Sequence, residues 1–112
     1  VHLCTYFQFP KLQKNLLEVA NTLHPTPAVG GVPKKKAQEF IFANEPHDRS
    51  FYTGFLGPTN AFETQLFVNL RCASWTKKTT TLYIGAGITL ESDPEKEWLE
   101  TQRKAKTLAS VL

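Results

Sequence analysis

The sequence predicts an α+β fold in which an antiparallel sheet packs with helices. Two observations indicate these elements: several segments space their apolar residues as a helix does, and two neighbouring segments alternate as strands do. The length of 112 residues is a third observation, because a domain has about 150 residues on average. The chain therefore corresponds to one domain or to a piece of one.

Three segments are predicted to be helices. Residues 11–23 carry apolar side chains mostly at i, i+4, i+7 and i+8 spacing, which is typical of an amphipathic helix. Residues 24–32 contain two prolines and two glycines and are predicted to be non-helical. Pro33 opens the second helix, because its missing N–H is not needed in a first turn. The last helix follows Ser92 and Asp93, either of which can cap it.

Four segments are predicted to be strands because they are rich in β-branched and aromatic residues. Two of them are short, residues 1–9 and residues 50–55. The clearest alternation is in residues 64–75, which a turn at residues 76–78 joins to residues 79–89. These last two strands are expected to form a hairpin.

Composition excludes several classes of protein. The 13 Lys and Arg residues against 10 Asp and Glu residues give a net charge of +3 that is spread along the chain, so we expect no nucleic-acid partner. The longest apolar run is only a few residues, which is too short to cross a membrane, and no membrane partner is expected. Cys4 and Cys72 are isolated thiols, which suit a reducing cytosol and predict a cytoplasmic protein.

The chain has no methionine, begins with Val1 and has no signal-peptide pattern. These features predict an excised piece of a longer protein. The alternative is a processed or re-engineered N-terminus.

The last predicted helix carries a candidate metal site. Glu97, Glu100 and Lys104 are three and four residues apart and share one face of the helix. Two neighbouring carboxylates suit Mg²⁺, which prefers carboxylate, water and ligand oxygens. The alternative is a surface helix with an ordinary Glu–Lys ion pair.

The predicted hairpin carries a candidate carboxylate site. Arg71 lies in an otherwise apolar strand, where a charge must be paired or face a cavity. Gly85 lies on the returning strand, where glycine often marks the close approach of a ligand. One carboxylate could therefore accept from the Arg71 fork and from the Gly85 N–H. A β-bulge with an internal salt bridge is the alternative.

Several motifs occur together in a fixed order along nearly the whole chain. They are residues 23–33 (LHPTPAVGGVP), 44–49 (NEPHDR), 51–54 (FYTG), 70–73 (LRCA), 82–88 (LYIGAGI), 92–95 (SDPE) and 97–101 (EWLET), followed by Lys104. This series resembles the C-terminal part of the chorismate-utilising enzymes, and within them the isochorismate synthase branch. The resemblance implies that residues 1–112 are the C-terminal segment of a larger chorismate-binding α/β sandwich.

The resemblance also implies an activity, the Mg²⁺-dependent isomerisation of chorismate to isochorismate, and a role for individual residues. By similarity, Glu100 is a Mg²⁺ ligand, Glu97 lies beside it or acts through a water molecule, and the ion binds the ring carboxylate of chorismate. Arg71 and the Gly85 amide hold the enolpyruvyl carboxylate. The remaining family positions match Lys104 in the anion-binding wall, Tyr52, Ala28 and Val29 in the substrate pocket, and His2 as the catalytic histidine.

Ala28 favours the water-using branch, because the amine-transferring members have the sequence TLSGAPK in this region. An anthranilate or aminodeoxychorismate synthase component remains an alternative, as does a non-catalytic binding module. The sequence leaves open whether the product is used for menaquinone, a siderophore or salicylate.

In the family, a lysine general base, a glutamate general acid and a further Mg²⁺ glutamate lie upstream of these motifs. The resemblance therefore implies that the 112 residues alone are inactive. Strand edges and apolar faces left without partners also predict self-association of the chain.

Overall fold

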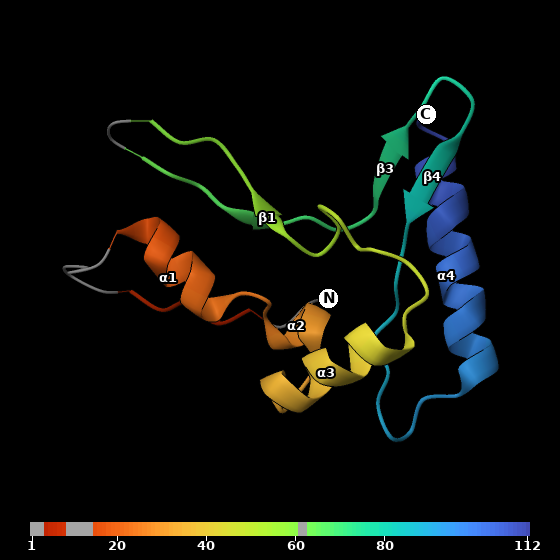
Figure 1. Ribbon diagram of the computed structural model, residues 1–112, viewed down its shortest axis with the longest axis horizontal. Coiled ribbons are helices and arrows are strands. Elements are labelled where there is room, and N and C mark those ends of the chain that lie inside the picture. The colour runs from red at the N-terminus through yellow and green to blue at the C-terminus, as the bar shows by residue number, and fades with distance from the viewer. Residues whose placement is uncertain (1–3, 9–14, 61–62) are drawn as a thin grey trace.

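The computed structural model describes residues 4–8, 15–60 and 63–112, and these residues have the predicted α+β character (Figure 1). The helices are α1 (Leu16–Leu23), α2 (Pro27–Gly30), α3 (Lys34–Asn44) and α4 (Pro94–Ala109). The strands are β1 (Phe55–Leu56), β2 (Phe67–Val68), β3 (Cys72–Trp75) and β4 (Thr80–Tyr83). In the described part of the chain the strands form two antiparallel pairs, β1 with β2 and β3 with β4, rather than one sheet.

The N-terminal helices differ from the prediction at their boundaries. Helix α1 begins at Leu16 because Asn15 has extended backbone and its side chain accepts a hydrogen bond of 2.9 Å from the Glu18 N–H. The predicted start at residue 11 is therefore too early, and residues 11–14 lie outside the described ranges. The prediction that residues 24–32 are non-helical is wrong for α2, which is a single helical turn with Pro27 in its first position.

The predicted strand at residues 50–55 is also wrong, except at its end. Ser50 and Thr53 have φ angles of 48° and 63°, so this segment turns instead of extending. Only Phe55 belongs to a strand, β1. The predicted first strand is not present at residues 4–8, and its other residues lie outside the described ranges.

The predicted hairpin is confirmed in a shorter form. Cys72 lies opposite Tyr83 at its open end, and Trp75 lies opposite Thr80 next to the turn. The long strand predicted for residues 64–75 is interrupted at Arg71, whose φ of 48° separates β2 from β3. The prediction that Gly85 lies on the returning strand is wrong, because β4 ends at Tyr83 and Gly85 lies in the segment that leads to the last helix.

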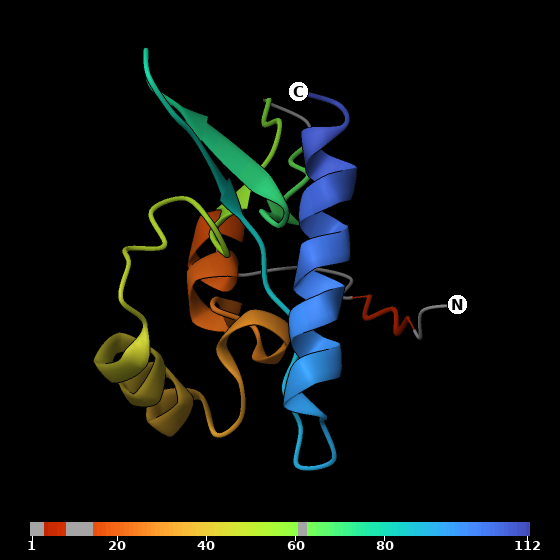
Figure 2. The ribbon, with the colours of Figure 1, turned by 90° about the vertical axis from the view of Figure 1, so that its right-hand side faces the viewer.

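Helix α4 follows the prediction closely. Asp93 is its N-cap and accepts a 3.0 Å hydrogen bond from the Lys96 N–H, and Pro94 lies in the first turn. The helix runs alongside β4, which it contacts (Figure 2). This packing brings the face of α4 that carries Lys104 against the segment that follows the hairpin.

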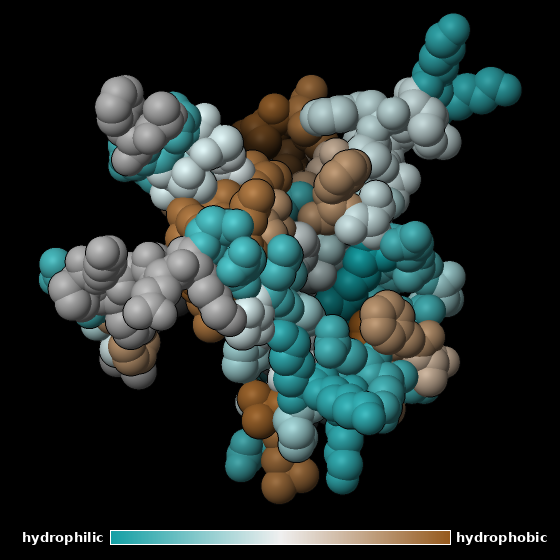
Figure 3. Space-filling model, turned by 60° about the vertical axis from the view of Figure 1, so that its left-hand side comes forward, coloured by the Kyte–Doolittle hydropathy of each residue, from teal (hydrophilic) through white to brown (hydrophobic). Residues whose placement is uncertain are grey.

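Much of the apolar surface of the chain is uncovered. Among the described residues no apolar side chain is fully buried, and apolar groups reach the surface over several elements (Figure 3). The accessible surface area is 10065 Å², whereas a compact protein of 12.6 kDa has about 6,200 Å². The radius of gyration is 16.4 Å, against about 13 Å for a compact chain of this length. The elements are therefore held by local pairing rather than by a closed core.

The helices of the described residues include none with the length and apolarity needed to span a bilayer.

Candidate functional site

Lys104 connects helix α4 to the segment after β4. Its Nζ lies 2.5 Å from Oε1 of Glu100 and donates a 3.0 Å hydrogen bond to the carbonyl oxygen of Gly85. The Lys104 side chain is 22% exposed and that of Glu100 is 52% exposed, so the pair lies at the edge of the packed surface. The hydrogen bond and charge of Lys104 hold the pKa of the Glu100 carboxyl below its usual value, and the charge of Arg71 lowers it further.

Arg71 lies at the break between β2 and β3, and it is exposed. Its backbone has left-handed dihedral angles, which cost a residue other than glycine about 1 kcal/mol. Its guanidinium forms no hydrogen bond or ion pair within the described residues, although its charge acts on Glu100. The geometry therefore provides an unengaged cation near the Lys104–Glu100 pair.

Tyr52 packs closely against Gly85. A Cβ atom placed on Gly85 would lie 2.4 Å from the Tyr52 hydroxyl oxygen, so the close approach requires glycine. The Tyr52 ring stacks on Tyr83 of β4 with a centroid distance of 5.9 Å. Burial raises the pKa of the Tyr52 phenol, and the nearby Arg49 opposes this effect.

Glu97 lies in the first turn of α4 and is half-buried. Its Oε1 accepts a 3.1 Å hydrogen bond from the Ser92 hydroxyl, which orients the carboxylate. The described residues contain no group of three or more His, Cys, Asp or Glu side chains that could hold a metal ion. A metal ion at this face of α4 would therefore have two carboxylates as its candidate protein ligands, those of Glu97 and Glu100.

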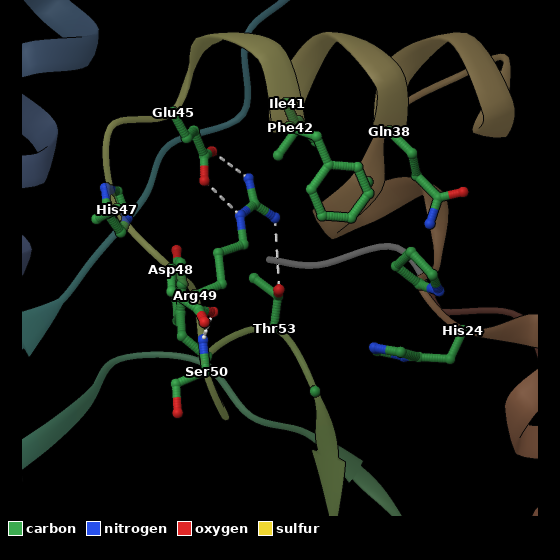
Figure 4. A pocket seen from close by; sticks show the side chains of 14 residues that line it. His24, Gln38, Ile41, Phe42, Glu45, His47, Asp48, Arg49, Ser50 and Thr53 are labelled. Carbon is green, nitrogen blue, oxygen red and sulfur yellow. Dashed lines mark hydrogen bonds and ion pairs between the residues drawn. The ribbon is translucent and has the colours of Figure 1, made fainter.

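Arg49 forms a second polar cluster, next to a cavity of about 500 Å³ (Figure 4). It makes a bidentate ion pair with Glu45, with 2.7 Å between Nε and Oε2, and donates from Nη1 to the carbonyl oxygen of Val29 at 2.9 Å and to Oγ1 of Thr53 at 3.4 Å. The ion pair lowers the pKa of Glu45 and raises that of Arg49.

The sequence analysis did not identify the Arg49 cluster. A signal was available, because Glu45 and Arg49 are four residues apart in the 44–49 motif. The other partners of Arg49, the Val29 carbonyl and the Thr53 hydroxyl, are brought to it by the tertiary fold. No local spacing in the sequence indicates the contact with Val29.

The structure brings most of the predicted site residues together. Tyr52, Gly85, Lys104 and Glu100 form a continuous chain of contacts, with Arg71 close enough to act on Glu100. The other predicted residues are placed as follows. Val29 reaches this group only through Arg49, Ala28 is exposed on α2, Glu97 is hydrogen-bonded to Ser92, and His2 lies outside the described residues.

Comparison with known proteins shows the class of this chain. The sequence model of the family described as "Chorismate binding enzyme" matches residues 1–112, so the chain belongs to that family.

The relatives include three isochorismate synthases. DhbC of Bacillus subtilis is 44% identical over 97 residues, which cover 86% of this chain and 24% of DhbC. MenF of Escherichia coli is 41% identical over 90 residues, covering 80% of this chain and 21% of MenF. EntC of Escherichia coli is 38% identical over 112 residues, covering 98% of this chain and 29% of EntC. The chain thus spans about a quarter of the length of these relatives. No solved structure matches it.

Proposed function

We propose that the chain is the C-terminal segment of an isochorismate synthase and forms the part of its catalytic domain that binds chorismate and Mg²⁺. The observation that carries the proposal is the position of Lys104, which joins Glu100 of α4 to Gly85 beside the exposed Arg71. In this proposal a metal ion on Glu97 and Glu100 receives one carboxylate of a small dianion, and the Arg71 guanidinium receives the other. The similarity to DhbC, MenF and EntC supports the choice of reaction.

In this proposal the two carboxylates of chorismate bind at opposite ends of the group. Arg71 is suited to the enolpyruvyl carboxylate because its fork has no hydrogen-bond or ion-pair partner among the described residues and can form a bidentate pair, and the Gly85 N–H provides an additional donor. Lys104, which lies between Gly85 and Glu100, adds a second positive charge to the site. By the resemblance to the family, Tyr52 is assigned to the wall of the substrate site, and Ala28 and Val29 are assigned to its small apolar side.

The residues present fit a magnesium site in which the protein supplies only part of the ligands. Mg²⁺ is usually held by one or two carboxylates, with water and substrate oxygens as its other ligands. Glu97 and Glu100 supply such a pair on α4, and the hydrogen bond from Ser92 already orients one of them. Glu100 would have to exchange its ammonium partner for the metal, while Lys104 keeps its bond to Gly85.

The proposed reaction adds water at one ring carbon of chorismate as the hydroxyl leaves another. When bound, Mg²⁺ neutralises the ring carboxylate and so stabilises charge that develops during the displacement. Arg71, Gly85 and Lys104 hold the dianion in place, and His2 is the candidate catalytic histidine. Proton transfer is assigned to groups upstream of this segment, so we expect the isolated 112 residues to be inactive.

The test is a Glu100→Ala exchange in the full-length protein that carries this chain. We expect the Mg²⁺-dependent formation of isochorismate to fall by about 100-fold or more, because one of two metal-binding carboxylates is lost. Glu95→Ala is the matched control, since Glu95 is an exposed acid in the first turn of the same helix. Product analysis by chromatography also separates isochorismate from the aminated product of an amine-transferring enzyme.

Two outcomes contradict the proposal. Turnover that survives Glu100→Ala removes the metal assignment, and an aminated product from the unaltered protein removes the water-using assignment. Isochorismate formation by the purified 112-residue chain contradicts the expectation that it is inactive alone.

A further inference from the structure

Arg49 links three segments that are separate in the sequence. Its side chain, 24% exposed, contacts Glu45 at the end of α3 and the Thr53 hydroxyl in the turn before β1 (Figure 4). It also donates to the Val29 carbonyl of α2. Glu45 uses both carboxylate oxygens and is itself 30% exposed. A bidentate pair of this kind fixes the plane of the guanidinium, and the remaining N–H groups therefore point in defined directions.

The contact with Val29 determines how the α2 turn is presented. The carbonyl oxygen of Val29 is held at 2.9 Å from Nη1 of Arg49. The next residue, Gly30, is buried, and a Cβ atom on it would lie 3.3 Å from the Pro25 side chain. The peptide that follows Val29 thus has a hydrogen bond to the guanidinium and close packing on Pro25, and both contacts restrict how the turn can tilt.

A second line of contacts leads from Arg49 to Gly85. The guanidinium carbon lies 5.9 Å from the centroid of the Tyr52 ring, within range of a cation–π interaction. The same ring stacks on Tyr83, and its hydroxyl lies against Gly85. Arg49 therefore contacts two residues that are assigned to the substrate site, Val29 and Tyr52.

We infer that Arg49, held by Glu45, is a positioning residue that sets the orientation of the Ala28–Val29 turn and of the Tyr52 ring in the substrate site. The inference rests on the proposed function, because it names what orders that site. Arg49 itself does not need to touch the substrate. Its action depends on the fork of the guanidinium, so a lysine at this position retains the charge and loses the geometry.

The main test compares Arg49→Lys with the unaltered full-length protein. We expect kcat/KM for chorismate to fall by about 10- to 100-fold, because small displacements of positioning groups reduce rates on that scale. The thermal unfolding midpoint should change by only a few degrees. Arg103→Lys is the control, because Arg103 is an exposed arginine on α4. Glu45→Gln is the milder second variant; it keeps a neutral hydrogen-bond acceptor and should give an intermediate loss.

A spectroscopic readout distinguishes positioning from a purely structural role and does not depend on turnover. The guanidinium lowers the pKa of the Tyr52 phenol, against the raising effects of burial, Glu45 and Cys72. In Arg49→Gln the pKa of Tyr52 should therefore rise, as measured by NMR titration of ¹³C-labelled tyrosine with Tyr52→Phe to assign the signal.

The outcomes separate this inference from the proposed function. If the unaltered protein forms no isochorismate, the proposed function fails, and the Tyr52 titration still reports whether Arg49 controls that ring. The inference is overturned if Arg49→Lys keeps kcat/KM within twofold, or if the Tyr52 signal is unchanged in Arg49→Gln. It is also overturned if activity falls only in proportion to a loss of folded protein.

Discussion

Lys104 is the residue at which the last helix and the segment after the hairpin meet. Its ammonium is shared between a carboxylate and a backbone carbonyl, so it neutralises Glu100 and fixes the position of Gly85 at the same time. Gly85 in turn lies under the Tyr52 hydroxyl, at a distance that no side chain would allow. Small substitutions at these residues should therefore affect stability more than the same substitutions at neighbouring positions in the chain.

Gly85→Ala should destabilise the protein by about 1–3 kcal/mol, because the new methyl group overlaps the Tyr52 hydroxyl oxygen at 2.4 Å. Adding Tyr52→Phe should restore much of the loss, since the next ring atom, Cζ, is 3.7 Å away. Gly87→Ala is the matched control, because nothing lies within 4 Å of its added Cβ. Thermal unfolding midpoints of the four proteins test this, and equal effects of the two alanines contradict it.

The Glu45–Arg49 pair should contribute to stability in a way that depends on pH. The ion pair lowers the pKa of Glu45 below the value of 4.5 that applies in an unfolded chain. The stabilisation is therefore fully present above about pH 4.5 and is lost as the pH falls through the lower folded value. The midpoint difference between the protein and its Glu45→Gln variant should shrink from pH 7 to pH 3. A constant difference across that range contradicts the assignment.

At the scale of elements, the last helix shows what local signals determine. Its N-cap, its first-turn proline and the shared face of Glu97, Glu100 and Lys104 were all predictable, because they depend on spacings of three or four residues. The packing of this helix on β4 then brings Lys104, with its partner Glu100, to the carbonyl oxygen of Gly85. The part of the candidate site on α4 was therefore predictable from the sequence.

The breaks in the strands were not predictable. Left-handed backbone at Ser50, Thr53 and Arg71 ends or interrupts extended segments, and the sequence gives no warning because glycine and asparagine are the usual markers of such positions. The α2 turn was missed because residues 24–32, which contain it, hold two prolines and two glycines and so indicate a loop, although proline is accepted in a first helical turn. The contact between Arg49 and Val29 spans 20 residues and depends on both of these features.

Asp93→Ala should loosen the start of α4. Loss of an N-cap side chain destabilises a helix by about 1 kcal/mol, because the Lys96 N–H loses its acceptor. Amide hydrogen exchange should accelerate by about fivefold in the first turn, which is the same free energy expressed as a rate. Glu91→Ala, at an exposed position just before the helix, is the control. Unchanged exchange in the first turn contradicts the capping role.

At the scale of the whole molecule, the uncovered apolar surface is the dominant feature. Large side chains such as Phe42 and Phe51 are more than four-fifths exposed, and no described apolar residue is fully buried. Soluble monomers rarely expose contiguous apolar patches of more than a few hundred Å². The relatives that this chain matches are about four times as long, which supports the proposal that residues 1–112 pack against further protein within a larger domain.

The purified 112-residue chain is expected to self-associate, because association is the remaining way to remove this surface from water. Light scattering should give a mass above the 12.6 kDa of one chain. Phe42→Ser combined with Phe51→Ser should lower the mass, whereas Lys35→Ser, an exposed polar change on α3, should leave it unaltered. A monomer at all concentrations contradicts the prediction.

The exposed apolar side chains should also affect the heat capacity change of unfolding, which calorimetry measures. The heat capacity of unfolding follows the apolar area newly exposed to water and amounts to about 12–15 cal/mol/K per residue in compact domains. A chain whose phenylalanines and leucines are already hydrated has less to expose, so its heat capacity step should be smaller and its melting curve broader. Docking onto a complementary protein would restore a sharp transition, and the size of that change would report how much surface the partner covers.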